Sequence, residues 1–519
     1  MDDETRMPLE APAIDDDVES PTRRLEERVA LGGRSLRSHA ARGVLINSAF
    51  QIGFALLGLV KRVGVAVFLT ASEFGLWGIL VTVMITLGWL KQVGINDKYI
   101  QQDEADQELA FQKAFTLELA YTLAFYALVV IALPAYALLY DRSEIIVPGL
   151  VLSLAFLATA LQTPIWIAYR QMRFVRQRTL EAIDPVVSVI VTLGLAAAGA
   201  GYWALVVGAI AGSFSSAAAA VAWSPYRLAW RFDRATLREY FSFSWPLIAS
   251  GASGILIVQG SVLIGNYAVG LAGLGFLALA QSFSTFVDRV DEVIRYTIYP
   301  AVCAVADRRD LLLEAFTKSN RLALMWGVPF GTALALFGPD LVEFVLGEKW
   351  VGATGLMQAF GLILAARQIA FNWTIFMRAT NRTKPIAISA ACGLVTFLVI
   401  TGPLMIWLGL TGYAIGMSIG VLVDLVVRWR YVSELFGGFN LLRHSGRAMV
   451  PSAIGAGVVG LARLAGSGLD RGLGLAVAEL VLYVLVVIAA TIAVERSLLR
   501  EMTAYLRRGS RQAPAPAPG

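Results

Sequence analysis

The sequence predicts an all-α, polytopic membrane protein with about 14 transmembrane helices. Of its 519 residues, 57% are hydrophobic and only 16% are charged, whereas soluble domains carry about 25% charged residues. Apolar runs of about 20 residues recur along the chain, and each is long enough to cross a hydrocarbon core of about 30 Å as a helix. Strands of a membrane barrel would appear as shorter segments of alternating polarity, so we expect helices throughout.

The apolar runs fall into a first set of six, a second set of six and a final pair. Polar, basic or glycine-rich stretches separate them, which is typical of turns between membrane helices. In chain order the predicted transmembrane helices are 44–69, 76–96, 115–139, 145–168, 180–199, 202–224, 243–267, 270–299, 321–346, 353–377, 385–408, 411–430, 449–465 and 473–494.

The distribution of lysine and arginine supports this helix count. If residue 1 lies inside, about 33 of the 43 Lys and Arg residues fall in inner segments, about three fall outside and about seven within helices. The inner segments include 169–178, 226–240, 378–384 and the loop at 428–447. Because basic residues accumulate in cytoplasmic loops, we expect both termini in the cytoplasm.

The first twelve helices read as two repeats of six. An offset of about 200 places Gly75 against Gly275, and an offset of about 211 places Tyr202 against Tyr413. Because six is an even number, both repeats start on the same side of the membrane and run parallel. We therefore expect two six-helix lobes around a central cleft, followed by two appended helices.

The predicted domains follow from this repeat and from the polar ends of the chain. Residues 1–43 are expected to be a disordered or amphipathic cytoplasmic tail, and 495–519 a basic, Pro/Ala-rich cytoplasmic tail. Between them we expect an N-lobe at 44–224, a basic cytoplasmic linker at 225–242, a C-lobe at 243–430 and the final helix pair at 449–494.

Several classes of function are disfavoured. The only cysteines, Cys303 and Cys392, lie on different predicted helices, and the only histidines, His39 and His444, fall in predicted cytoplasmic segments. These residues predict no disulfide framework, metal site or cofactor, and no GxxxxGK[ST] loop for ATP hydrolysis is present. The predicted outer loops are too short to hold a catalytic site. We therefore expect a transporter rather than an enzyme, driven by an ion gradient, the substrate gradient or another subunit.

Three stretches resemble a known family: "ASEFGLWGILVTVMITLGWLKQVGINDKYIQ" (71–101), "YRQMRFVRQRTLEAIDPVVSVIVTLGLAAAGAGYWALVVG" (169–208) and "LALAQSFSTFVDRVDEVIRYTIYPAVCAVADRRDLLLEAFTKSNRLAL" (277–324). They are similar to the polysaccharide transporter branch of the multidrug/oligosaccharidyl-lipid/polysaccharide (MOP) flippase superfamily, which includes the Wzx-type O-antigen and exopolysaccharide flippases. The resemblance extends over about residues 43–435.

The resemblance implies a flippase in the bacterial cytoplasmic (inner) membrane. Its substrate would be an undecaprenyl-pyrophosphate-linked oligosaccharide, moved from the inner to the outer leaflet by alternating access for O-antigen, capsule or exopolysaccharide synthesis. One position departs from the family pattern: where the family often has "LDxLLIG", this chain has "QGSVLIG" (259–265), with Gly260 in place of the aspartate.

Two adjacent cations on the first predicted helix are candidate substrate ligands. A charge at bilayer depth costs a few kcal/mol, so it normally faces a wet cavity or a partner. Gln51, Gly58 and Arg62 share one face, since eleven residues make about three turns, while Lys61 points about 100° away. We expect Arg62 to face the cleft and Lys61 to lie at its margin. The alternative is that both side chains snorkel to the outer headgroups.

Two further helices carry an isolated cation. Lys91 lies in the inner half of the second predicted helix, and Arg367 lies near the middle of the tenth. Both are candidates for the cationic cleft. The alternatives are that Lys91 reaches the inner headgroups and that Arg367 pairs with another helix.

The eighth predicted helix is dense in charge, with Asp288, Arg289, Asp291, Glu292 and Arg295 in "FVDRVDEVIRY". One hypothesis is that the three carboxylates bind and release a coupling proton or Na⁺ while the two arginines hold pyrophosphate. The alternative is that the charges pair along the helix, Asp291 with Arg295 and Glu292 with Arg289, at an end that emerges into the cytoplasm.

A cleft with cations at several depths suits a pyrophosphate lipid. Guanidinium groups bind its oxygens in pairs, and lysine acts as a point charge. The expected partners are this lipid, the bilayer, a proton or Na⁺, and other polysaccharide-assembly proteins. Three rivals remain at this point: a cation-coupled multidrug or small-molecule exporter of the same superfamily, a structural membrane protein, and a membrane glycosyl polymerase.

Overall fold

The structure, a computed structural model, describes residues 36–91, 95–101, 104–234, 236, 252–305, 307–380, 382, 384–465, 471–496 and 500. Within these ranges the regular secondary structure is helical throughout. Most of the predicted N-terminal tail, most of the C-terminal tail and the start of the predicted seventh helix lie outside the described residues.

The first lobe consists of the helices up to residue 222. Its elements are α2 (Leu36–Phe68), α3 (Ala71–Leu90), α4 (Ile95–Gln101), α5 (Gln107–Tyr140), η1 (Ser143–Ile145), α6 (Ile146–Leu161), α7 (Pro164–Arg170), α8 (Phe174–Ala197) and α9 (Trp203–Ala222).

The second lobe and the appended pair follow. They comprise α11 (Ala252–Ala268), α12 (Gly270–Ala304), α13 (Arg309–Leu341), η2 (Val342–Leu346), η3 (Glu348–Ala353), α14 (Thr354–Arg367), α15 (Trp373–Ala379), α16 (Lys384–Thr396), η4 (Phe397–Thr401), α17 (Gly402–Leu435), α18 (Leu441–Ala465) and α19 (Leu473–Val494).

The helices are long and apolar enough to make a multi-pass membrane protein. Twelve candidate spans occur among the described residues, and one of them, Lys384–Leu435, is 52 residues long. Gly409, with φ 60° and ψ −136°, interrupts this run. Counting it as two spans and adding the shorter apolar helix Ile255–Ala268 gives the fourteen expected from the sequence.

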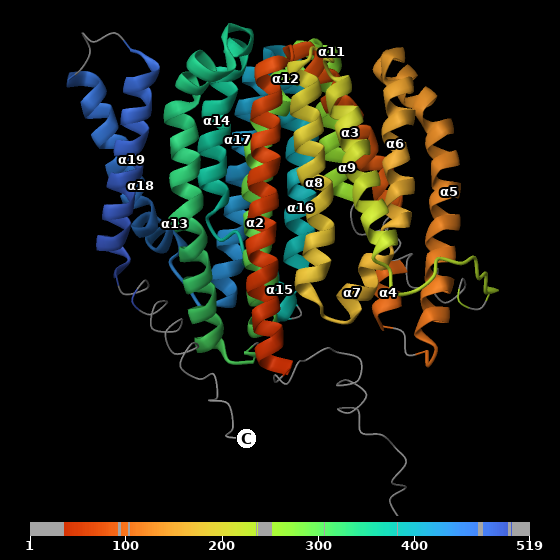
Figure 1. The fold of residues 1–519 in the computed structure, drawn as a ribbon. Coiled ribbons are helices and arrows are strands. Elements are labelled where there is room, and N and C mark those ends of the chain that lie inside the picture. The colour runs from red at the N-terminus through yellow and green to blue at the C-terminus, as the bar shows by residue number, and fades with distance from the viewer. Residues whose placement is uncertain are drawn as a thin grey trace, which may run out of the picture.

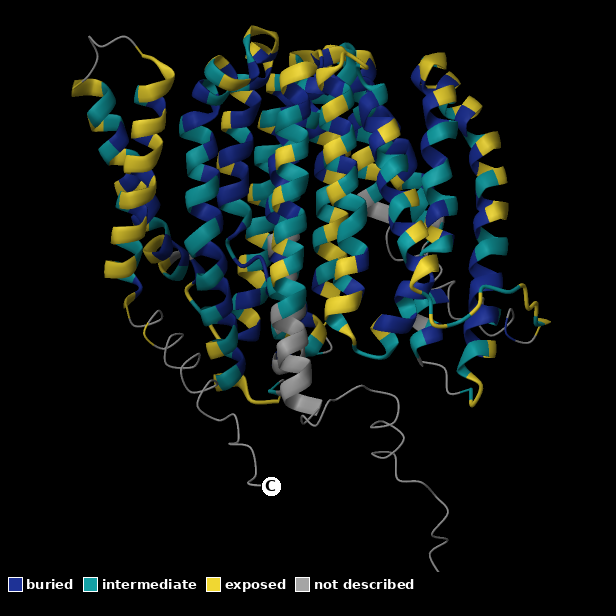
Figure 2. Ribbon diagram, viewed as in Figure 1, coloured by how far each residue is buried: buried dark blue, intermediate teal, exposed yellow. Residues whose placement is uncertain are grey.

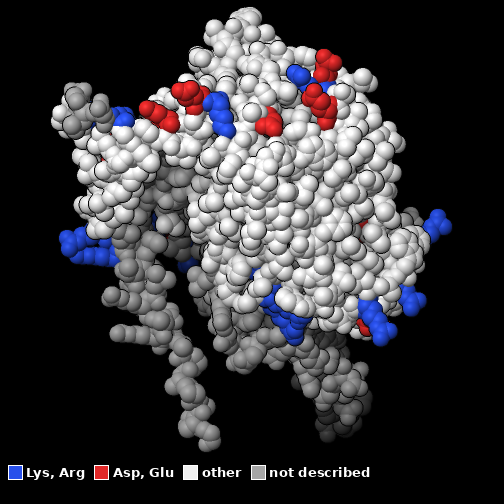
Figure 3. Space-filling model, turned by 45° about the horizontal axis from the view of Figure 1, so that its top comes forward, with Lys and Arg blue, Asp and Glu red and all other residues white. Residues whose placement is uncertain are grey.

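The elements stand side by side as one bundle with α18 and α19 at one edge (Figure 1). The start of α2 and the end of α19 lie at the same end of the bundle, which we call the termini side; the other end is the opposite side. Exposed residues line the outward faces of α5, α18 and α19 (Figure 2). A broad uncharged belt separates the charged side chains near the two ends (Figure 3), as expected for a surface in contact with lipid tails.

Glycines allow the two arms of the α16–α17 hairpin to approach closely. A Cβ added at Gly412 would lie 1.9 Å from the carbonyl oxygen of Leu404, and one at Gly416 would lie 2.5 Å from the Cα of Thr401. The GxxxG spacing of these residues is typical of close helix contacts in membranes. Here the closely packed neighbour is the preceding arm of the same hairpin.

We expect Gly412→Val to destabilise the protein by about 1–3 kcal/mol, because the added side chain overlaps the backbone at Leu404. Thermal unfolding of the purified protein in detergent measures the effect. Gly457→Val in α18 is the matched control, since a Cβ at Gly457 meets nothing within 4 Å. Equal melting temperatures for the two variants would contradict this account of the hairpin.

The two lobes meet along a reciprocal seam between α3 and α12. A Cβ at Gly75 would lie 1.9 Å from the carbonyl oxygen of Leu271, and a Cβ at Gly275 would lie 1.9 Å from that of Ala71. Both residues of one contact are related to those of the other by the same offset of 200. The repeat found in the sequence therefore also relates the two sides of this interface.

Hydrogen bonds join the lobes at the opposite side. From the second lobe, Trp350 Nε1 donates to the carbonyl oxygen of Ala66 at 2.8 Å. Also from the second lobe, Asn266 Nδ2 donates to the carbonyl oxygen of Tyr140 at 2.7 Å, and the Tyr267 hydroxyl donates to that of Leu139 at 2.7 Å. In this conformation the lobes are therefore joined on the side away from the termini.

The predicted bounds of the inner loop, 428–447, are too wide. α17 continues to Leu435, and α18 already begins at Leu441. Arg428, which the predicted helix 411–430 also includes, forms an ion pair with Asp424 at 2.6 Å. His444, expected in a cytoplasmic segment, lies in α18, 3.2 Å from the amide oxygen of Asn320. The hydropathy pattern missed the last turns of α17 and the first turns of α18, because their polar side chains make the apolar part of each helix look shorter than the helix itself.

An ionic cluster attaches the appended pair to the second lobe. Asp340 of α13 accepts from Arg471 at 2.6 Å and from Arg463 of α18 at 3.1 Å. Glu479 of α19 accepts from the same two arginines, at 3.0 and 2.9 Å. Four charges that would each be costly in lipid are thereby compensated.

Candidate functional site

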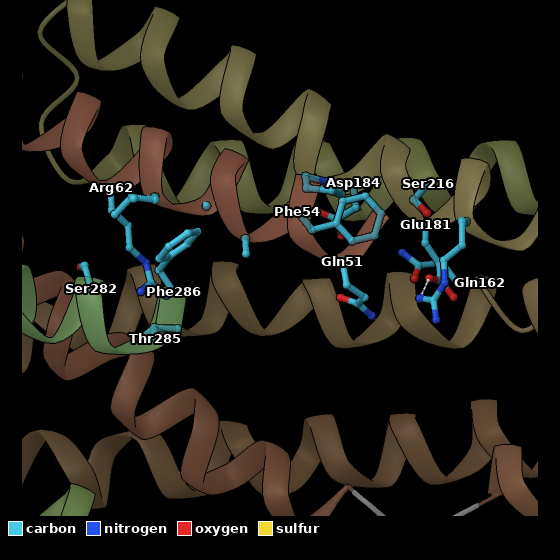
Figure 4. A pocket seen from close by; sticks show the side chains of 15 residues that line it. Gln51, Phe54, Arg62, Gln162, Glu181, Asp184, Ser216, Ser282, Thr285 and Phe286 are labelled. Atoms are coloured by element: carbon cyan, nitrogen blue, oxygen red, sulfur yellow. Dashed lines mark hydrogen bonds and ion pairs between the residues drawn. The ribbon is translucent and has the colours of Figure 1, made fainter. Parts of the chain in front are cut away.

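A polar cavity lies between the first lobe and α12. Its volume is about 450 Å³. α2 contributes one wall and α8 another, while Ser282, Thr285 and Phe286 of α12 close it from the second lobe (Figure 4). Because both lobes line the cavity, a relative movement of the lobes would change its shape.

Arg62 lines the cavity, on the face predicted from its spacing. Gln51 and Gly58 line it as well, so the three residues do share one side of α2. Eleven residues of helix separate Gln51 from Arg62, which corresponds to about 16 Å along the axis. In Figure 4, Arg62 lies beside Ser282 and Phe286, whereas Gln51 lies with Gln162 and Glu181.

Lys61 does not line the cavity. Its ammonium group donates to the Ser188 hydroxyl of α8 at 2.6 Å. Nearby, Asp184 lines the cavity and accepts a hydrogen bond from the Ser213 hydroxyl of α9 at 2.8 Å. Lys61 therefore lies at the contact between α2 and α8 and is not among the residues that line the cavity.

Sequence analysis missed a charged group at the termini-side end of the cavity. Arg178 and Glu181 both line it and form an ion pair with each other. Arg178 also donates to the Asn47 amide oxygen at 2.8 Å. The stretch 169–178 was assigned to an inner loop, which excluded Arg178. Glu181 and Asp184 fall inside the predicted fifth helix. Carboxylates within a membrane helix indicate a functional site, so this position could have identified them.

Lys91 lies in a separate ion pair. Its ammonium is 2.8 Å from the Glu118 carboxylate of α5 and 2.9 Å from the Thr159 hydroxyl of α6. Both charged side chains are 11% exposed. The structure thus gives Lys91 a bonding role between three helices and does not bring it to the cavity.

Arg367 joins the charged end of α12 to α14. Its guanidinium is 2.9 Å from the Asp288 carboxylate, and Gln368 donates to Asp291 at 2.9 Å. Asp291 is only 6% exposed. Asp288 and Asp291 thus make contacts between helices, where one alternative from the sequence was a pairing of Asp291 with Arg295 along α12.

The other predicted site residues of α12 are Glu292, Arg295 and Arg289. Glu292 and Arg295 are half-buried on the part of α12 that approaches the termini side. The side chain of Arg289 lies outside the described residues. The group around Asp288 and Arg367 is distinct from the residues that line the cavity.

At Gly260, where this chain departs from the family pattern, an aromatic ring lies close by. A Cβ added there would lie 2.6 Å from the Phe397 ring. Phe397 thus occupies the space that a side chain at position 260 would need. No aspartate fits at this position without displacing the ring.

A family model described as "Polysaccharide biosynthesis protein" matches residues 65–354. No curated protein sequence matches the chain significantly. The fold is similar to a solved structure of lipid II flippase MurJ in an inward closed conformation, with 13% identity, coverage of 88% of this chain and 100% of that chain, and a TM-score of 0.70.

Two transporter structures are similar at lower scores. A multidrug resistance MATE family transporter of the MOP superfamily, in an inward-facing conformation, has 14% identity, coverage of 76% and 100%, and a TM-score of 0.58. A MOP superfamily transporter from Pyrococcus furiosus, whose binding pocket is described as having reverse polarity, has 12% identity, coverage of 76% and 96%, and a TM-score of 0.52. At these identities the likeness concerns the fold.

Proposed function

Because the chain belongs to the family of polysaccharide biosynthesis proteins, we propose that it is a flippase for lipid-linked oligosaccharides. Its substrate would be an undecaprenyl-pyrophosphate-linked repeat unit, moved from the inner to the outer leaflet of the bacterial cytoplasmic membrane. The termini would lie in the cytoplasm. The fold of a multi-pass MOP transporter supports a transporter rather than an enzyme.

The observation that carries this proposal is the position of Arg62. It lines a cavity of about 450 Å³ that both lobes enclose, in the half of α2 nearer the opposite side. A guanidinium group binds two phosphate oxygens at once, and the bond is stronger where water is excluded. The cavity can therefore hold a pyrophosphate group between the two lobes.

Transport would follow from alternating access. The seam at Gly75 and Gly275 and the hydrogen bonds of Trp350 and Asn266 join the lobes on the opposite side. Release to the outer leaflet requires these contacts to break and the termini side to close. Small residues at the seam suit such a change, because only short side chains separate the two backbones.

Ion coupling would involve the carboxylates of α12. Asp288, Asp291 and Glu292 remain the proposed binding groups for a proton or Na⁺, and Arg367, Arg289 and Arg295 the proposed cations near them. The ion pair of Arg367 with Asp288 offers a simple exchange: an anionic headgroup that binds Arg367 releases the carboxylate for a cation. Partner proteins of polysaccharide assembly would bind elsewhere on the surface.

A second candidate function is export of cationic small molecules. Glu181 and Asp184 both line the cavity, so its carboxylates equal its arginines in number. An exporter of cations would use these two acidic groups as ligands. The flippase is the better supported function because the family match concerns polysaccharide biosynthesis.

The test is translocation by purified protein in liposomes. A fluorescent lipid-pyrophosphate oligosaccharide is incorporated, and its appearance in the outer leaflet is followed with and without the protein. We expect protein-dependent movement of this lipid and no uptake of a cationic dye such as ethidium. Dye transport without lipid movement would instead favour the exporter.

A further inference from the structure

The cavity has two ends of different chemistry. Arg62 marks one end together with Ser282, Thr285 and Phe286, and Gln51 and Gln162 mark the other (Figure 4). The spacing along α2 puts about 16 Å between Gln51 and Arg62. A ligand that contacts both ends must therefore be elongated.

The termini-side end is polar but compensated in charge. Arg178 is paired with Glu181, and Gln177 also donates to Glu181 at 2.9 Å. An anion gains little from this end, because the carboxylate cancels the arginine. Neutral hydroxyl groups, in contrast, find donors and acceptors on the amides and on this ion pair.

The two glutamines differ in how they are held. Gln162 donates from Nε2 to the carbonyl oxygen of Ser213 at 3.0 Å, which fixes the amide and leaves its oxygen as an acceptor. Among the residues that the structure describes, Gln51 has no hydrogen-bond partner, although it is half-buried in the cavity wall. A side-chain amide in such a place gains from a polar ligand.

The ring of Phe54 lies beside Gln51 and Asp184, on the same helix as Gln51 and Arg62 (Figure 4). Aromatic rings offer an apolar face to the C–H side of a pyranose, while amides and carboxylates bond its hydroxyls. The combination of one ring, two amides and an ion pair is thus suited to a sugar.

We propose that the termini-side end of this cavity, with Gln51, Phe54 and Gln162 as its contacting residues, binds the saccharide next to the pyrophosphate, which Arg62 holds at the other end. This inference rests on the proposed function. It orients the substrate along α2, with the phosphates deep in the bundle and the sugars toward the termini side. Ligand pockets of about 300–1,000 Å³ enclose drug-sized molecules, so a cavity of about 450 Å³ holds the proximal sugars and not a long chain.

The experiment compares binding of two probes to the full-length protein in nanodiscs. One probe is undecaprenyl pyrophosphate, which has no sugar; the other is undecaprenyl-pyrophosphoryl N-acetylglucosamine. We expect Gln51→Leu and Gln162→Leu to weaken binding of the second probe about three- to tenfold, the value of one or two neutral hydrogen bonds. Binding of the sugar-free probe should stay at the wild-type level, whereas Arg62→Ala should weaken binding of both probes.

Gln358→Leu is the matched control. This glutamine lies on α14, is exposed, and donates to the carbonyl oxygen of Ala335 outside the cavity, so its loss should change neither affinity. Gln51→Asn should retain part of the sugar-dependent affinity that Gln51→Leu loses, because it keeps the amide. A loss caused by unfolding would not depend on the amide in this way.

Each other result is decisive. If the two leucine variants lose affinity for both probes equally, or for neither, the proposed saccharide site is wrong, while the proposed flippase function stands. A wild-type protein that binds neither probe would overturn the flippase and this inference together.

Discussion

A disulfide between positions 78 and 278 is expected to abolish translocation. A Cβ at Gly78 would lie 3.3 Å from the Cβ of Ala278, and disulfides bridge Cβ atoms about 3.5–4.5 Å apart, so Gly78→Cys with Ala278→Cys needs only a small adjustment. The bond would join α3 of the first lobe to α12 of the second. If the lobes must separate at this seam to release the substrate, the cross-linked protein stays closed on the opposite side.

The measurement is the liposome assay on the oxidised protein and again after reduction. Cys303 and Cys392, the two native cysteines, are first replaced by serine. We expect transport to disappear on oxidation and to return with reductant.

Gly338→Cys with Met357→Cys provides the matched control, since those Cβ atoms are 3.6 Å apart on α13 and α14 of the same lobe. Its oxidation should leave transport unchanged. Full transport by a protein shown to be cross-linked at 78 and 278 would rule out separation at the seam.

Removal of the Arg62 guanidinium is expected to have a comparably large effect. We expect Arg62→Ala to reduce translocation of the lipid-pyrophosphate oligosaccharide about 10- to 100-fold, the equivalent of a hydrogen bond to a charged group. Arg62→Lys should retain part of the rate, because it keeps the charge but loses the paired donors. Equal insertion must be verified for each variant.

Arg430→Ala is the control for loss of a cation from the chain. Arg430 is 66% exposed and pairs with Glu434 on the same helix, so its removal should leave the rate unchanged. If Arg62→Ala transports at the wild-type rate, the cavity arginine is structural, and the substrate assignment depends on the family match alone.

The fold was predictable because membrane helices need apolar length and little else. The repeat was also visible in the sequence, and Gly75 and Gly275 were aligned by their offset. What the alignment did not reveal is that the two glycines belong to one interface. Correspondence between repeats describes similar positions, whereas contact depends on how the lobes are arranged in space.

The candidate site was predictable only where a single helix determines it. The face of Arg62 follows from the helical period, and the structure agrees. The partners of Lys91 and Arg367 lie 27 and 79 residues away in the chain, and no local pattern reveals such pairs. Arg178 was missed for another reason: the predicted fifth helix begins at residue 180, two residues after it. Helix boundaries are the least certain part of a prediction.

The ionic cluster of the appended helices has a consequence for biogenesis. Asp340 is 8% exposed in side-chain area, and both of its ion-pair partners, Arg463 and Arg471, come later in the chain. Until α18 and the segment that follows it are in place, this carboxylate lacks both of these partners. We therefore expect the second lobe to reach its final stability only after the last hairpin is inserted, because Asp340 lacks both arginines until then.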